Sequence, residues 1–97
     1  MNYWIMRCYK NQSLKIIEHL VKCGSTVGFN LFGRSTHSIE FTVGSVVFWV
    51  KRNRHDWYVD MHDQQGKRKM INLDKFASKK FWIQLETVVI FAFAQNA

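Results

Sequence analysis

The chain has 97 residues, of which 47% are hydrophobic and 15% aromatic, so it suits one domain over residues 1–97 with a buried core and is too apolar for a disordered segment. Fourteen Lys and Arg residues against seven Asp and Glu residues give a net charge of +7, which predicts attraction to phosphate backbones, anionic lipid or an acidic protein surface. The longest apolar tract, residues 88–94, is far shorter than the roughly 20 residues that span a bilayer, so we expect no membrane partner.

The first segment predicts a strand followed by a helix. Residues 3–9 form a plausible strand, although both of its sides are largely apolar. Ser13 is suited to cap the following helix, and Gly24 is suited to end it. The apolar positions that recur there at helical spacing are Leu14, Ile17, Leu20 and Val21.

This opening resembles a known pattern. The run Tyr3-Trp4-Ile5-Met6-Arg7-Cys8-Tyr9-Lys10, followed by a helix with Glu18-His19-Leu20, is similar to the first strand and helix of the N-terminal domain of NusG-type transcription elongation factors. The segments after Gly24 do not continue the strand and helix order of that family. The resemblance therefore implies a strand–helix start and carries no functional residue over to this chain.

The middle of the chain predicts an antiparallel meander over residues 38–73. Residues 38–43 alternate apolar and polar side chains, which indicates a strand with one buried face. Residues 46–50 are continuously β-branched and aromatic, which is typical of a central strand buried on both faces. Residues 57–61 alternate again, and the turn composition that follows them predicts that residues 67–73 return as another strand. Before the meander, Val27, Phe29 and Leu31 fit a short strand or equally a packed loop.

A second helix is predicted after the meander, with Asp74 as the candidate N-cap. One face of this helix would carry the apolar residues Phe76, Ala77, Phe81, Leu85, Val88 and Ala92. Residues 87–94 are apolar all round, so they are either the buried end of this helix or a separate strand. Continuity with the amphipathic pattern favours the helix, and we expect the tract to lie under the sheet or against a partner.

Together these segments predict an α+β fold. We expect a four- or five-stranded, mainly antiparallel sheet, with one early and one late helix packed on one of its faces.

Basic residues provide the most informative candidate site. One group lies in a predicted loop over residues 51–55, and another follows the next turn, at the far end of a strand and therefore roughly 20 Å away. Such a stripe could follow a nucleic-acid backbone, with aromatic side chains stacking on exposed bases, or it could meet an acidic protein surface. Alternatively, it is a solvated sheet edge that opposes strand pairing. The candidate binding residues are Trp49, Lys51, Arg52, Arg54, Tyr58, Lys67, Arg68 and Lys69.

Acid–base groups gather in one place only, at His55, Asp56, Asp60, His62 and Asp63. A small ribonuclease could use a histidine of this cluster with Lys67 or Arg68. The spacing matches no specific signature, so we expect no catalytic residue.

Metal and cofactor motifs are not recognisable in the sequence. The residues Cys8, His19, Cys23 and His37 lack a paired ligand spacing such as C-x-x-C, and the glycines match no nucleotide-binding loop, so no metal and no cofactor are expected. Two cysteines and no signal-peptide pattern indicate a reducing, cytoplasmic environment.

The sequence leads us to expect a small basic, non-enzymatic binding protein. It would dock on a larger protein of nucleic-acid metabolism, a nuclease, helicase or polymerase, as an inhibitor or modulator of the kind encoded by phages and mobile elements. A sequence-tolerant nucleic-acid-binding protein is the first alternative, and a small ribonuclease toxin is the second.

Overall fold

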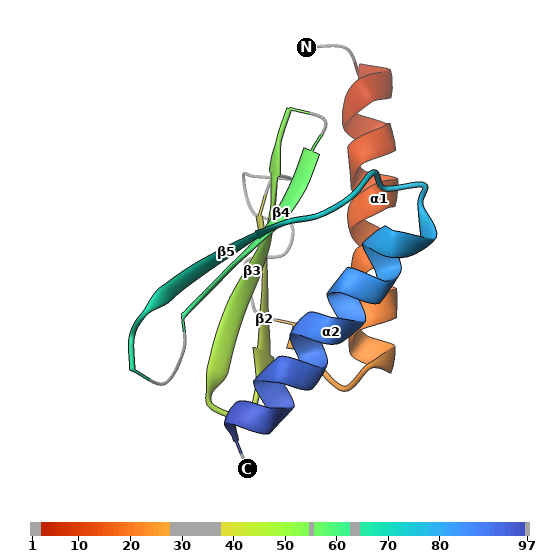
Figure 1. Cartoon of the computed structure of the whole chain (residues 1–97). Helices are drawn as coiled ribbons and strands as arrows, with labels where there is room; N and C mark the ends of the chain where they lie inside the picture. Colours follow the sequence, from red (N-terminus) through yellow and green to blue (C-terminus); the bar gives the residue numbers. More distant parts are fainter. Residues whose placement is uncertain (1–2, 28–37, 55, 63–64, 97) are drawn as a thin grey trace.

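The computed structural model describes residues 3–27, 38–54, 56–62 and 65–96, and for residues 3–10 it describes the backbone only. The elements run in the order α1 (Tyr3–Lys22), β1 (Thr26–Val27), β2 (Ser38–Val43), β3 (Val46–Asn53), β4 (Asp56–His62), β5 (Arg68–Asn72) and α2 (Lys79–Gln95). The strands form one five-stranded sheet in the order β1-β2-β3-β4-β5, and every neighbouring pair is antiparallel. Both helices cover the same face of the sheet (Figure 1). The predicted α+β meander is confirmed.

Helix α1 begins before the predicted position. Residues 3–9 are helical, so the predicted first strand is wrong, and the strand on which the NusG-type resemblance depended does not exist. The reason is that both sides of this segment are apolar, which removes the two-residue contrast of a strand, and no Gly or Pro interrupts the chain before Gly24. The fifth strand of the sheet is β1, which includes Val27 of the segment that was predicted as either a strand or a loop. Phe29 and Leu31 of that prediction lie outside the described residues.

The buried stripe of α1 is rotated from the predicted one. Ser13, Ile16 and Leu20 are buried, whereas Leu14 and Val21 are 45% and 48% exposed. Ser13 is therefore an interior residue of the helix and not its cap. Two overlapping stripes have helical spacing in this segment, and only contact with the sheet selects between them. The helix ends at Gly24 as predicted, where φ is +105° and the Ser25 amide donates to the Leu20 carbonyl at 3.0 Å.

The sheet is buried on one face only. In β3, Val46, Phe48 and Val50 are fully buried toward the helices, while Val47 and Trp49 are half-buried on the opposite face. The prediction that this strand is buried on both faces is therefore wrong. Its apolar run reflects the preference of β-branched and aromatic residues for strands and not a second covering layer.

The core lies between this face and the two helices. It consists of Ile16, Leu20, Ile39, Phe41, Val43, Val46, Phe48, Val50, Trp57, Val59, Met61, Phe81, Leu85, Val88, Val89 and Ala92. Within the described residues, neither helix combines the length and the apolarity needed to cross a membrane.

Helix α2 is continuous through residues 87–94, which confirms the helical interpretation of that tract. Its N-cap is Ser78, whose hydroxyl accepts from the Phe81 amide at 3.3 Å. The predicted cap, Asp74, lies one turn earlier and accepts from the Lys75 amide at 2.7 Å instead. The predicted apolar face is correct for the helical residues, since Phe81, Leu85, Val88 and Ala92 are all buried.

Asn96 fixes the end of α2 to the β2–β3 turn. Its Nδ2 donates to the Val43 carbonyl at 2.8 Å, and its Oδ1 accepts from the backbone amide and the hydroxyl of Ser45 at 3.0 and 2.9 Å. Gly44 makes this approach feasible, because φ is +58° there and a Cβ would lie 2.5 Å from Oδ1 of Asn96. A residue at the end of the chain thus connects the last helix to the first hairpin.

Replacing Asn96 with alanine should lower the free energy of unfolding by about 1–2 kcal/mol, because its side-chain amide makes several hydrogen bonds at a partly exposed position. Urea denaturation would measure the change. Asn96→Asp keeps the acceptor for Ser45 but sets a carboxylate oxygen against the Val43 and Ala92 carbonyls at the C-terminus of α2, so its loss should be at least as large. Equal stability of Asn96→Ala and the wild type would contradict the role of this contact.

Candidate functional site

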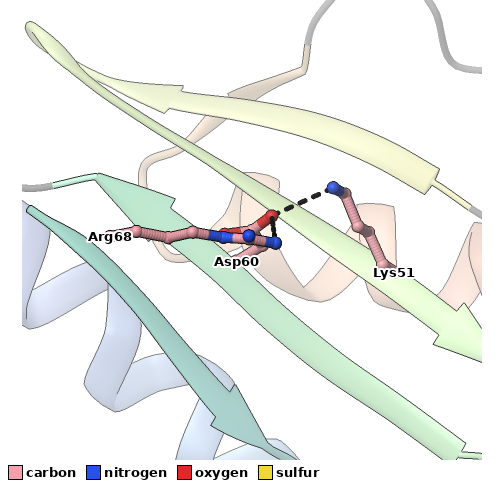
Figure 2. Close-up of polar contacts among 3 residues, drawn as sticks. All are labelled: Lys51, Asp60 and Arg68. Atoms are coloured by element: carbon pink, nitrogen blue, oxygen red, sulfur yellow. Dashed lines mark hydrogen bonds and ion pairs between the residues drawn. The ribbon is translucent and has the colours of Figure 1, made fainter.

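Asp60 lies at the centre of the sheet face that the helices leave open. Its carboxylate accepts from Lys51 Nζ at 3.0 Å, from Arg68 Nε at 3.0 Å and from Arg68 Nη2 at 3.1 Å (Figure 2). Lys51 is on β3 and Arg68 is on β5, so the three residues connect the three consecutive strands. Asp60 is only 3% exposed although no helix covers it, because the two long side chains lie over it.

These contacts change the acidity of the carboxyl group. The hydrogen bonds from Arg68 and Lys51 hold the pKa of Asp60 below its usual range, against the opposing effect of burial. Reciprocally, the hydrogen bond to Asp60 raises the pKa of the Arg68 guanidinium. The carboxylate is thus held in its charged form by its partners.

The register of the strands explains why the two predicted basic groups meet. Lys51 is opposite Tyr58 and Arg68 is opposite His62, so each cation is a diagonal neighbour of Asp60. The prediction placed the two groups roughly 20 Å apart, at opposite ends of the strand between them. That separation is wrong for Lys51 and Arg68, because both side chains reach to the middle of β4.

The other predicted basic residues do not join this cluster. Strand β3 continues through Asn53, so the predicted loop over residues 51–55 is wrong at its first three positions. Arg52 is directed to the helix side, where it is 7% exposed and its guanidinium carbon lies 6.0 Å from the Trp57 ring centre. Lys69 is also on that side, with Nζ 4.9 Å from the ring centre of Phe91.

Arg54 and Lys67 are exposed near the ends of β3 and β5. Because Arg54 has a positive φ of 59°, it forms the turn that follows β3. The predicted binding residues are therefore divided between the two faces and the edges of the sheet, and they do not form one continuous stripe.

The predicted aromatic residues do lie beside a cation on the open face. The Trp49 ring is 5.7 Å from Lys51 Nζ, and its centre is 5.8 Å from the ring centre of His62 in an edge-to-face arrangement. Tyr58 is half-buried on the same face, opposite Lys51.

Of the predicted acid–base cluster, His55 and Asp63 lie outside the described residues. Asp60 interacts with two cations, and the His62 ring lies against Trp49. The described part of the cluster therefore does not pair a carboxylate with a histidine.

An apolar groove on the other side of the sheet was not predicted. It lies between β5 and α2, and its cavity volume is about 300 Å³. Residues that line it include Lys69, Ile71, Lys80, Ile83, Thr87 and Phe91. A second hollow of about 200 Å³ shares Lys69 and Phe91 with it and is also lined by Lys67 and Arg68. The groove is thus apolar along its length and basic at one end.

One sequence signal could have indicated this groove. Helix α2 carries apolar residues outside its core-facing stripe, and Ile83 and Ile90 remain 59% and 67% exposed. A helix that packs on one face of one sheet can bury only one stripe, so a second apolar stripe indicates a further contact.

The Asp60 cluster predicts a defined pH dependence. Because the folded-state pKa of Asp60 is lowered, its stabilisation should be complete above the unfolded-state pKa of about 3.9 and should be lost as the pH falls through the lower folded-state value. Asp60→Asn should therefore lower the urea midpoint at neutral pH, and the difference from the wild type should shrink below about pH 4.

The matched control is Asp56→Asn, which removes an exposed carboxylate from the same strand and the same face. It should leave the urea midpoint almost unchanged across this pH range. A difference between Asp60→Asn and the wild type that stays constant down to acid pH would contradict the assignment.

Comparison with known proteins adds no assignment to this geometry. No protein-family model matches the chain, no curated protein matches it and no solved structure matches it.

Proposed function

We propose that the chain is a non-enzymatic binding protein that docks on a larger protein of nucleic-acid metabolism, a nuclease, helicase or polymerase, and modulates its activity. The observation that carries this proposal is the apolar groove between β5 and α2, with Ile83 exposed along it and Lys69 and Lys80 among its lining residues. Apolar clefts with a few placed charges are the usual form of a specific binding site.

The partner is an extended segment that pairs with β5. This strand is the last of the sheet order, so its outer edge can accept a further strand. On the helix side, β5 presents Lys69 and Ile71 to the groove. A paired segment would direct every second side chain into the same groove, because side chains alternate along a strand.

Charge defines the chemistry of that segment. Lys69 and Lys80 line the groove, Lys67 lines the hollow beside it, and the whole chain carries a net charge of +7. A segment that alternates apolar residues with Asp or Glu matches both features. A second copy of the chain is a poorer match, because each copy carries the same net charge of +7 and supplies no acidic segment for the basic end of the groove.

Protein docking is favoured over direct phosphate binding by the position of the cations. Lys51 and Arg68 share the buried carboxylate of Asp60, so a phosphate would compete with an existing charged partner. Arg52 is directed to the core side. Of the residues predicted to contact phosphate, few are both exposed and on one surface.

The basic residues outside the groove would lie near the nucleic acid that the partner enzyme binds. The net charge of +7 favours a position near phosphate backbones, and Arg54 is exposed at a turn away from the Asp60 cluster. Direct, sequence-tolerant nucleic-acid binding is the second candidate, and it is supported by Trp49 and Lys51 lying together on the open face.

Capture from lysate with nuclease treatment tests the docking proposal. Wild-type chain should retain a nucleic-acid-processing enzyme, identified by mass spectrometry, after all nucleic acid has been digested. Ile83→Glu should reduce retention at least tenfold, because it places a carboxylate in the apolar groove. The control is Val21→Glu on α1, which changes the same charge at an aliphatic position of similar exposure outside the groove.

Three outcomes would overturn the proposal. They are loss of every partner on nuclease treatment, equal retention by Ile83→Glu, and a wild-type homodimer in light scattering that Ile83→Glu dissociates. The last would assign the groove to a second copy.

Duplex binding by the isolated chain should be weak, with a dissociation constant of roughly 10⁻⁵ M or higher at physiological salt. Fluorescence anisotropy over a range of salt concentrations would measure it. If Arg54 and Lys67 contact phosphates directly, each exchange to glutamine should reduce the slope of log affinity against log salt by up to about 0.9. Tight binding to one duplex sequence would move direct nucleic-acid recognition to first place.

A further inference from the structure

Three side chains with metal-ligand chemistry converge where the end of α1 meets α2. His19 is in the last turns of α1, and Cys23 follows four residues later, with its backbone amide donating to the His19 carbonyl at 3.1 Å. Glu86 reaches this pair from the middle of α2. The His19 Nε2 atom lies 4.0 Å from Cys23 Sγ and 3.9 Å from Glu86 Oε1, and the three ligand atoms all lie within 4.8 Å of one another.

We propose that His19, Cys23 and Glu86 form a binding site for Zn²⁺ or a similar borderline-soft divalent ion. Imidazole nitrogen, thiolate sulfur and carboxylate oxygen are the donors that Zn²⁺ accepts, whereas Mg²⁺ and Ca²⁺ prefer oxygen donors alone. Three protein ligands leave one tetrahedral position open for water or for a ligand supplied by a partner.

The distances require a closing movement of about 1 Å at Glu86. Metal–ligand bonds of 2.0–2.3 Å in a tetrahedron separate neighbouring ligand atoms by about 3.4–3.6 Å. The two separations from His19 Nε2, at 4.0 and 3.9 Å, need to shorten by about 0.5 Å, and the third, between Cys23 Sγ and the Glu86 carboxylate, lies within 4.8 Å and needs to shorten by up to about 1.2 Å. The Glu86 side chain is 52% exposed, so it can adjust its rotamer without disturbing the core.

The neighbours of the site hold the imidazole in position. The ring of Trp82 packs edge-to-face against His19, with the ring centres 5.0 Å apart. The backbone hydrogen bond between His19 and Cys23 fixes their separation on the helix. The His19 side chain is 25% exposed, so an ion can enter from solvent. The competing arrangement is a simple ion pair, in which protonated His19 faces Glu86 and Cys23 takes no part.

The sequence does not indicate this site by ligand spacing. His19 and Cys23 are four residues apart, a spacing that places both on one helix face. The third ligand, Glu86, is on α2, which follows all five strands in the sequence. A bound ion would tie α1 to α2 and stabilise the packing of both on the sheet. This inference is independent of the docking proposal.

Cobalt substitution tests the site on the purified full chain in a phosphine-reduced buffer. Wild-type chain should bind Co²⁺ with the near-ultraviolet absorption of a cobalt–thiolate bond and intense visible bands of tetrahedral geometry, and Zn²⁺ should displace it. Cys23→Ser should lose the thiolate absorption, and Glu86→Gln should weaken Co²⁺ binding at least tenfold. Circular dichroism would confirm that each variant is folded.

Matched controls use residues of the same types elsewhere. Cys8→Ser and His62→Ala should bind Co²⁺ as the wild type does, and the same excess of Zn²⁺ should raise the melting temperature of both controls more than that of Glu86→Gln. The proposal is overturned if wild-type chain gives no cobalt–thiolate absorption, if Cys23→Ser retains it, or if affinity is unchanged in Glu86→Gln. In each case the three side chains do not form a metal site.

Discussion

Both helices pack on the same face of the sheet, and this one-sided cover determines how the rest of the chain is used. The covered face takes Phe41, Phe48 and Val59 out of water, and their burial supplies the main driving force for folding. The other face has no layer of its own in the described residues, so its central position, Asp60, is shielded by charged side chains. On the helix side, α2 covers the sheet only up to β5, and a groove remains beside that strand.

The Asp60 cluster is better understood as a determinant of register than as a source of stability. A buried carboxylate with two cations recovers roughly what it costs to remove the charges from water, so such a cluster adds little net stability, although losing one partner is costly. A shift of β4 by one residue would instead turn Asp60 toward Phe48 and Phe41, away from Lys51 and Arg68 on the opposite face. We infer that the cluster disfavours alternative pairings of β3, β4 and β5.

The parts of the fold that could be predicted from sequence have a strong local signal. Strands β2 and β4 alternate between apolar and polar residues, and this contrast exists without any knowledge of neighbours. The start of α1 has no such contrast, so the choice between helix and strand there depends on tertiary packing. Arg52 was misplaced for a related reason, because a basic residue at the end of an apolar run looks like a loop residue, although its stem can lie along the core.

The site features depend on contacts between distant segments, which a single sequence does not encode in any spacing. Asp60 and Arg68 meet only because β5 has a particular register against β4. The groove requires β5 and α2 to be neighbours, and the His19–Glu86 contact requires the two helices to lie side by side. The predicted aromatic and basic residues of the candidate site are divided between the two faces of the sheet, and this division follows from strand alternation combined with the position of the helices.

Helix α2 takes part in three different contacts, and its attachment limits how they can influence one another. Leu85 is directed to the core, Ile83 to the groove and Glu86 to α1, which is consistent with the spread of neighbouring residues around a helix. Ser78 caps one end of this helix, and Asn96 ties the other end to the β2–β3 turn. Coupling between two binding sites requires an element with two arrangements that both ligands can bias. A helix fixed at both ends and along its core stripe does not provide one, so a ligand in the groove and an ion between the helices should bind independently.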